Sequence, residues 1–248
     1  MAEHMARTSM GSGWWVALLC AVWCVYTGDH VLDARREPAQ GDGSRRAFHR
    51  RHARRLSIAV ACVVPVGLAA AATLPPPLLR FGLGLSALAI AYLASAQGLF
   101  LAHLPKEPIA GALYAAGIWG GPIAMSEGSD PWLILAAAVH GLAAVLNLTV
   151  FGVFEIEADR AEGHRSLARR FGRAATTSVA LLAATIAALA SIGMAAAGRD
   201  TLVWCVLAIQ VAVPAALLLA RPWSDREERY RLWGDSVFLL GAAPRLLS

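Results

Sequence analysis

Long apolar segments alternate with short charged segments along the whole chain. Each apolar segment holds few acidic or basic residues, and eight can be distinguished. They cover residues 14–32, 56–74, 78–102, 108–125, 131–154, 174–197, 201–220 and 232–247. A helix needs about 20 residues to cross the apolar layer of a bilayer, so the fourth and eighth are barely long enough. We therefore expect an all-α, polytopic transmembrane helix bundle of about eight membrane helices, forming a single domain over residues 1–248.

The composition supports a membrane protein and argues against a nucleic-acid-binding one. Hydrophobic residues make up 57% of the chain and charged residues only 16%, whereas an ordinary soluble domain carries about 25% charge. The net charge of +5 alone would also suit a protein that binds nucleic acid. The arginines, however, lie between apolar segments, where membrane proteins place them. We expect the lipid bilayer as a partner, and no nucleic acid.

The basic residues fall almost entirely on one set of alternate loops. That set comprises residues 33–55, 103–107, 157–173 and 221–231. Of the 22 Lys and Arg, all but Arg7, Arg80, Arg199 and Arg245 belong to it. Basic loops stay on the cytoplasmic side of a membrane. The pattern predicts a multi-pass protein of the plasma membrane or bacterial inner membrane, with these loops cytoplasmic and both termini outside.

Two pairs of carboxylates stand where predicted membrane helices end. Asp29 and Asp33 close the first helix, and Glu155 and Asp159 close the fifth. Residues four apart share one face of a helix. By the predicted topology both pairs lie at the cytoplasmic edge, and an Arg-rich loop follows each. Charged residues there are costly unless they are paired, hydrated or used.

The combination of acids and arginines suits a lipid diphosphate. Clustered carboxylates repel one another unless a cation lies between them, and Mg²⁺ bridges carboxylates to substrate phosphates. Arginine binds phosphate oxygens with two parallel hydrogen bonds. The candidate diphosphate-binding residues are Arg45, Arg46, Lys106, Asn147 and Arg160. As an alternative, the acids are hydrated and pair with nearby arginines, Asn147 bonds a neighbouring helix, and Lys106 marks the membrane interface.

Polar residues of the fifth segment gather on one side. His140, Asn147, Glu155 and Asp159 fall within about a third of the circumference of a helix. Polar residues inside a membrane usually face a bundle interior or a wet cavity. His140 lies deeper than the others, and we interpret it as structural.

A capping pattern precedes the last apolar segment. Ser224-Asp225-Arg226-Glu227 reads as a capping box, which satisfies the free amides at a helix start. It predicts that a short surface helix begins at Ser224.

The acidic pairs resemble the motifs of the UbiA-type intramembrane prenyltransferases. That family is an all-helical bundle of usually nine helices, with Asn-x3-Asp-x3-Asp after the second and Asp-x3-Asp after the sixth. Here the first motif reads Val25-x3-Asp29-x3-Asp33 and the second reads Glu155-x3-Asp159. Here the motifs follow the first and fifth helices, one helix earlier than in the family. The two orders agree if the family's first helix is absent from this chain.

The resemblance implies a function for the four carboxylates. Asp29, Asp33, Glu155 and Asp159 would be the catalytic, Mg²⁺-holding residues of a prenyltransferase. The enzyme would ionise an isoprenyl diphosphate and transfer its prenyl group to an acceptor. Two alternatives stay open. A UbiA-type terpene cyclase would ionise the same substrate without an acceptor, and a non-catalytic protein would bind or transport lipid.

Overall fold

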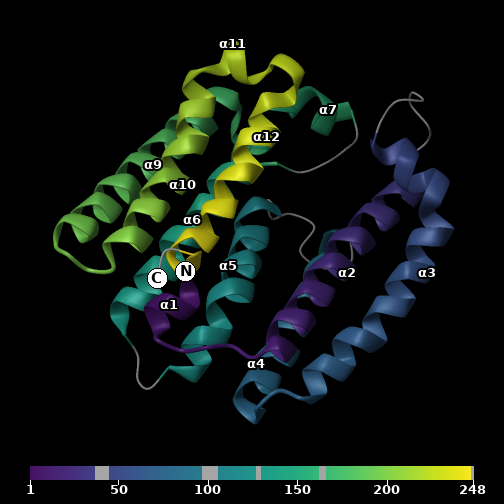
Figure 1. Cartoon of the computed structure of the whole chain (residues 1–248). Coiled ribbons are helices and arrows are strands. Elements are labelled where there is room, and N and C mark those ends of the chain that lie inside the picture. Colours follow the sequence, from purple (N-terminus) through teal and green to yellow (C-terminus); the bar gives the residue numbers. More distant parts are fainter. Residues whose placement is uncertain (37–44, 97–105, 127–129, 162–165, 247–248) are drawn as a thin grey trace. The chain divides into compact units, whose positions relative to one another are not determined.

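The computed structural model describes residues 1–36, 45–96, 106–126, 130–161 and 166–246, and all regular secondary structure in them is helical. These residues form two compact units. Unit 1 comprises residues 1–9 and 103–248, and unit 2 comprises residues 10–102. The all-α expectation is therefore confirmed for the described residues, while the single domain stays a prediction. Figure 1 shows the helices of both units.

Unit 2 consists of three long helices: α2 (Ser12–Arg36), α3 (Arg45–Ala72) and α4 (Pro76–Ala96). Helices α2 and α3 run side by side (Figure 1). Gly67 of α3 faces α2 so closely that a Cβ atom there would lie 2.9 Å from Cβ of Cys20. Small residues at such contacts let two membrane helices approach closely.

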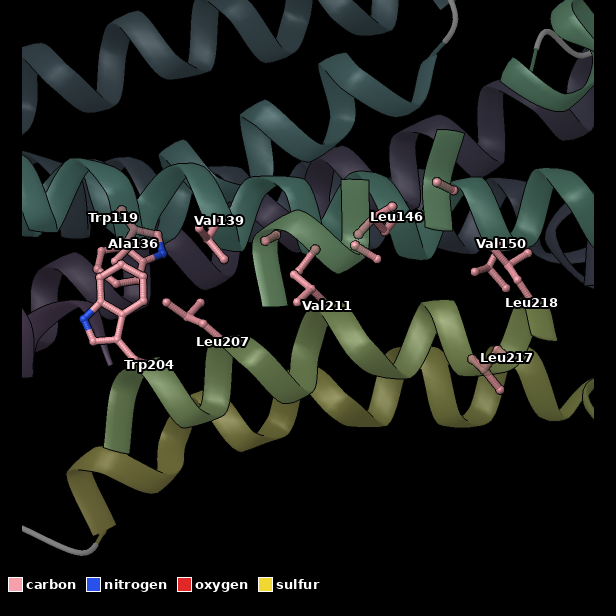
Figure 2. Close-up of a cluster of buried hydrophobic side chains, with 14 of the residues drawn as sticks. Trp119, Ala136, Val139, Leu146, Val150, Trp204, Leu207, Val211, Leu217 and Leu218 are labelled. Carbon is pink, nitrogen blue, oxygen red and sulfur yellow. The ribbon is translucent and has the colours of Figure 1, made fainter. Parts of the chain in front are cut away.

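Unit 1 is built around α6 (Pro131–Phe154), which packs against α5 (Lys106–Met125), α9 (Arg173–Ala196) and α10 (Thr201–Leu219). The start of α6 is fixed by Asp130, whose side chain accepts a hydrogen bond of 3.0 Å from the Trp132 amide. Figure 2 shows Val139, Leu146 and Val150 of α6 among the core side chains that α10 also supplies. The resulting apolar core positions the polar end of α6.

Short helices follow the polar ends of α6 and α10. After α6 come α7 (Ile156–Ala161) and α8 (Leu167–Phe171). After α10 come α11 (Arg221–Ser224), the 3₁₀ helix η1 (Arg226–Glu228), α12 (Arg229–Ser236), the 3₁₀ helix η2 (Val237–Ala242) and α13 (Ala243–Leu246). The short helix α1 (Ala2–Ala6) also belongs to this unit.

The predicted capping box is wrong. The Ser224 hydroxyl donates to the carbonyl of Leu217, 2.9 Å away, and so it points back into α10 instead of capping a following helix. The chain turns instead through Glu227 and Glu228, whose φ angles of 53° and 54° are left-handed. Helix α12 therefore begins at Arg229, five residues after Ser224.

Six helices of the described residues are long and apolar enough to cross a membrane. They cover Ser12–Leu32, Arg50–Ala72, Pro76–Ser95, Pro131–Phe154, Arg173–Ala196 and Thr201–Leu219. Exposed leucines and isoleucines on α9, such as Leu182, Ile186 and Leu189, suit contact with lipid. These findings support an integral membrane protein.

Two of the eight expected spans are not among these six. The fourth expected span, residues 108–125, is a continuous helix within α5 but does not appear among the candidate spans. The eighth, residues 232–247, changes from α to 3₁₀ and back to α, so no long apolar helix forms in its described part.

The topology predicts that α5 nevertheless crosses the membrane. In a variant without the four native cysteines, single cysteines are placed at Lys106 and Ser126, the two ends of α5. An impermeant maleimide should label Ser126→Cys in intact cells and Lys106→Cys only after permeabilisation, because basic loops stay inside. Labelling of both positions from one side would contradict an α5 that crosses the bilayer.

Candidate functional site

The two acidic pairs belong to different units. Asp29 and Asp33 lie one turn apart near the end of α2 in unit 2, and the side chain of Asp33 lies outside the described residues. Glu155 and Asp159 lie in unit 1. That all four carboxylates share one site therefore stays a prediction.

The second acidic pair keeps its one-turn spacing across a break in the helix. Helix α6 ends at Phe154, and Glu155 is its C-cap with φ −99° and ψ 15°. The Glu155 amide still donates to the Phe151 carbonyl, and the Asp159 amide donates to the Glu155 carbonyl, both at 2.8 Å. The backbone thus holds the predicted i,i+4 relation, although the two residues do not lie on one continuous helix.

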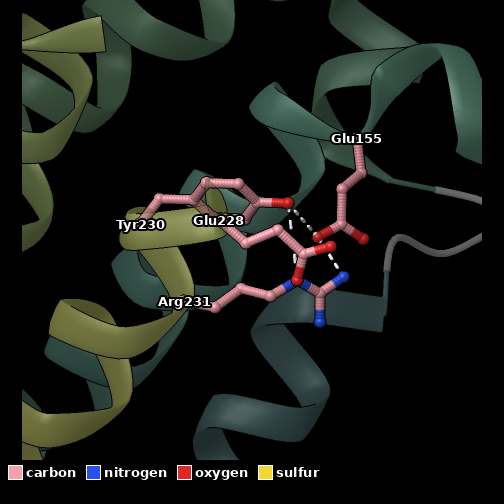
Figure 3. Close-up of polar contacts among 4 residues, drawn as sticks. All are labelled: Glu155, Glu228, Tyr230 and Arg231. Atoms are coloured by element: carbon pink, nitrogen blue, oxygen red, sulfur yellow. Dashed lines mark hydrogen bonds and ion pairs between the residues drawn. The ribbon is translucent and has the colours of Figure 1, made fainter. Parts of the chain in front are cut away.

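The Glu155 carboxylate is bound by the segment that follows α10. Its Oε1 accepts a hydrogen bond of 2.9 Å from the Tyr230 hydroxyl and forms an ion pair with Nη2 of Arg231. Nε of Arg231 lies 3.4 Å from Oε2 of Glu228. Figure 3 shows these four side chains converging from the end of α6 and the start of α12. Glu155 is therefore compensated by groups of the protein itself.

Aromatic rings hold Tyr230 and Arg231 in this arrangement. The Tyr230 ring stacks on Phe154, with centroids 4.6 Å apart and planes 7° apart. The Arg231 guanidinium lies over the Phe151 ring, 5.4 Å from its centroid. Burial raises the pKa of Tyr230 to about 12. The phenol therefore keeps its proton and donates to Glu155.

Sequence reasoning missed Glu107, the second residue of α5. Its side chain is only 2% exposed. Oε1 accepts a hydrogen bond of 2.8 Å from the Leu167 amide at the start of α8, whereas Oε2 is buried without a partner among the described residues. Burial raises the pKa of Glu107, although the Leu167 amide opposes the rise. In the sequence, Glu107 lies in the expected loop 103–107, and the pattern of apolar residues gives no sign that it is buried.

Asp159 lies on the same side of unit 1 and is 7% exposed. Arg169 of α8 donates through Nη1 to the Asp159 carbonyl oxygen at 3.3 Å. Helix α8 therefore contacts Asp159 through Arg169 and Glu107 through Leu167. One short helix thus contacts the backbone of Asp159 and the carboxylate of Glu107.

Two polar residues inside α6 have structural partners. Nδ2 of Asn147 donates to Oδ1 of Asp235 in α12 at 3.2 Å, as the interhelical alternative predicts. Nδ1 of His140 accepts from the Trp119 indole at 2.7 Å, and the Phe238 ring stacks on the imidazole. The structural interpretation of His140 fits these contacts.

The basic residues predicted to bind the diphosphate lie in several different environments. Arg160 forms an exposed ion pair of 2.9 Å with Glu157, one turn away in α7. Lys106 is exposed at the start of α5. Arg45 and Arg46 begin α3 in unit 2, and their side chains lie outside the described residues. Arg231 and Arg169, which the sequence did not single out, are the arginines that contact Glu155 and the Asp159 backbone of the second motif.

Within the part of the chain that the structure describes, no three His, Cys, Asp or Glu side chains form a group that could hold a metal ion. Among the described residues of unit 1, two carboxylates are buried, those of Glu107 and Asp159. Mg²⁺ is usually bound by one or two carboxylates together with substrate phosphates and waters, so a pair is sufficient for its protein ligands.

The ion pair of Glu155 and Arg231 should stabilise unit 1 measurably. Each side chain is 26% exposed, so we expect a coupling energy of about 1–3 kcal/mol, between the values for surface and buried pairs. The test is a double-mutant cycle of Glu155→Gln and Arg231→Gln, measured by thermal unfolding in detergent.

The exposed pair of Glu157 and Arg160, with side chains 73% and 64% exposed, is the matched control for that cycle. Its coupling should stay below about 0.5 kcal/mol. Equal coupling energies in the two cycles would contradict the contact that we describe for Glu155.

Glu107 should make the stability of unit 1 fall as the pH rises. Because its pKa is raised above the ordinary 4.5, the folded state holds a proton that the unfolded state releases. Its contribution is complete below pH 4.5 and is lost as the pH passes the raised value. Without divalent cations, the unfolding temperature of Glu107→Gln should depend less on pH than that of the parent protein. Glu157→Gln, at an exposed position, should follow the parent. An unchanged pH dependence in Glu107→Gln would contradict this prediction.

Comparison with known protein families, curated proteins and solved structures finds no match. The resemblance to the UbiA-type prenyltransferases stays a prediction. It is carried by Asp29 and Asp33 at the end of α2, by Glu155 and Asp159 after α6, and by the order of the helices.

Proposed function

We propose that the chain is an Mg²⁺-dependent membrane prenyltransferase with a UbiA-like bundle of eight spans. It ionises an isoprenyl diphosphate and transfers the prenyl group to an acceptor. Its basic loops and acidic motifs lie on the cytoplasmic side. The observation that carries the proposal is the second acidic motif. There a buried Asp159 follows the end of a candidate span, and arginines contact both ends of the motif.

Carboxylates and arginines together suit the charge of a diphosphate. Mg²⁺, when bound, would neutralise the diphosphate and make it a better leaving group. Asp29, Asp33 and Asp159 would be its carboxylate ligands, whereas Glu155, which pairs with Arg231, would hold the end of the motif in place. Guanidinium groups would stabilise the charge that develops on the departing oxygen.

The apolar helices would accommodate the prenyl chain. Most side chains of α9 and α10 are apolar, so an isoprenyl tail would meet mainly apolar groups there. Exclusion of water would protect the allylic cation from premature hydrolysis. The acceptor, or an internal double bond in a cyclase, would then attack the cation.

One observation favours the second candidate, a non-catalytic lipid-binding or transport protein. Glu155 already pairs with Arg231 and accepts from Tyr230. A carboxylate at a helix end that pairs with a nearby arginine needs no metal. A protein of this class would keep the apolar bundle and the ion pair and would release no diphosphate.

Diphosphate release tests the proposal. Membranes bearing the protein are given isoprenyl diphosphates of several chain lengths with Mg²⁺. Release should depend on Mg²⁺ and should fall by about 100-fold or more in Asp33→Asn and Asp159→Asn, because each removes a charge that acts in the transition state. Glu157→Gln, which alters an exposed carboxylate of α7, should keep the parent rate.

The outcomes separate the candidates. Release that requires an added acceptor supports a transferase, and release without one supports a cyclase. Release that survives both Asp substitutions contradicts the assigned site. If no chain length gives release, the protein belongs to the non-catalytic class.

A further inference from the structure

We propose that Glu107 and Asp159, with the hydroxyl of Ser166, form the divalent-cation site of unit 1, and that Glu155 is not a ligand of this cation. The use of the cation to ionise a diphosphate rests on the proposed function, whereas the binding of the cation does not. The ligand is a hard divalent cation of the Mg²⁺ type, since all three donors are oxygens.

Glu155 is poorly suited to bind a cation. The same oxygen, Oε1, accepts from Tyr230 and contacts the Arg231 guanidinium. A metal at this oxygen would have to displace an arginine that is also held by Glu228 and by the Phe151 ring. Oε1 of Glu155 is therefore already compensated without a metal.

Glu107 presents the opposite case. One oxygen accepts from the Leu167 amide, and the other is buried with no partner among the residues that the structure describes. A buried carboxylate oxygen without a hydrogen bond or counter-ion is unfavourable. A cation bound there would supply the missing interaction and leave the bond to Leu167 intact.

Ser166 is a second buried polar residue beside Glu107. It is 2% exposed, and its Oγ is also buried without a partner among the described residues. A Cβ atom at Gly152 of α6 would lie 3.2 Å from Oε1 of Glu107 and 3.5 Å from Oγ of Ser166. Both side chains thus approach the same bare stretch of α6, and the missing side chain of Gly152 makes room for them.

Asp159 is the second carboxylate of this group. Asp159 is buried, and α8, which begins directly after Ser166, contacts its backbone carbonyl through Arg169. The negative charge of Asp159 also helps to raise the pKa of Glu107. A cation bound by both carboxylates would reduce their mutual repulsion. Two carboxylates and a hydroxyl also leave coordination positions of Mg²⁺ open for water and phosphate.

Binding of Mn²⁺, which substitutes for Mg²⁺ at oxygen sites, tests the assignment without any prenyl substrate. The full chain is purified in detergent in an Asp29→Asn, Asp33→Asn background, so that the first motif does not contribute. Free Mn²⁺ is followed by electron paramagnetic resonance. Glu107→Gln keeps an oxygen for the Leu167 amide but removes the charge, and it should weaken binding at least about tenfold. Glu155→Gln, the matched control, should change the affinity less than about threefold.

Folding is checked by thermal unfolding without metal. If Glu107→Gln does not fold, Ser166→Ala, which removes no charge, should still weaken Mn²⁺ binding. The proposal is overturned if no Mn²⁺ binds, if Glu107→Gln binds as the background does, or if Glu155→Gln loses as much affinity as Glu107→Gln. Binding that depends on Glu107 together with an absence of diphosphate release would refute the proposed function and leave the cation site in place.

Discussion

The burial of α6 is the constraint on which unit 1 depends. Its apolar side chains lie in the core shared with α10, and its glycines let α5 approach, since a Cβ at Gly141 would lie 3.1 Å from that of Ala115. A helix so enclosed can place polar groups only where each finds a partner. His140 and Asn147 do so inside the bundle. The carboxylates Glu155 and Asp159 follow the end of the helix, which is where the candidate chemistry lies.

The two acidic residues that follow α6, Glu155 and Asp159, have different environments. Glu155, as the C-cap of α6, ties the segment after α10 to the helix through Tyr230 and Arg231. Asp159, one turn later, is buried, and its backbone carbonyl accepts from Arg169 of α8. The break between α6 and α7 produces this difference because it lets the two side chains take different environments while the backbone spacing stays helical. The sequence suggests that Glu155 and Asp159 act as one metal-binding pair. In unit 1, however, Glu155 forms an ion pair within the protein, whereas Asp159 is buried.

The sequence was sufficient to predict the long helices, but it was not sufficient to predict the contacts that polar residues make at the helix ends. Apolar runs longer than 18 residues specify α6, α9 and α10 almost alone, since lipid demands internally bonded backbone. The partners of the polar residues are distant in sequence: Leu167 is 60 residues from Glu107, and Tyr230 is 75 from Glu155. Contacts between residues so far apart in the chain cannot be predicted from short-range sequence spacing. The start of α12 was mispredicted for a related reason, because the Ser224 hydroxyl bonds back to α10 rather than forward.

The left-handed residues Glu227 and Glu228 carry a consequence for affinity. A non-glycine residue in this conformation costs about 1–3 kcal/mol. The free energy of folding, rather than that of ligand binding, offsets this cost. Tyr230 and Arg231 follow this turn and are held by Glu155 and by the rings of Phe154 and Phe151. In the proposed function, a guanidinium held in this way would lose little rotational freedom on binding the diphosphate, so the entropic penalty would be smaller than for a flexible loop of the same composition.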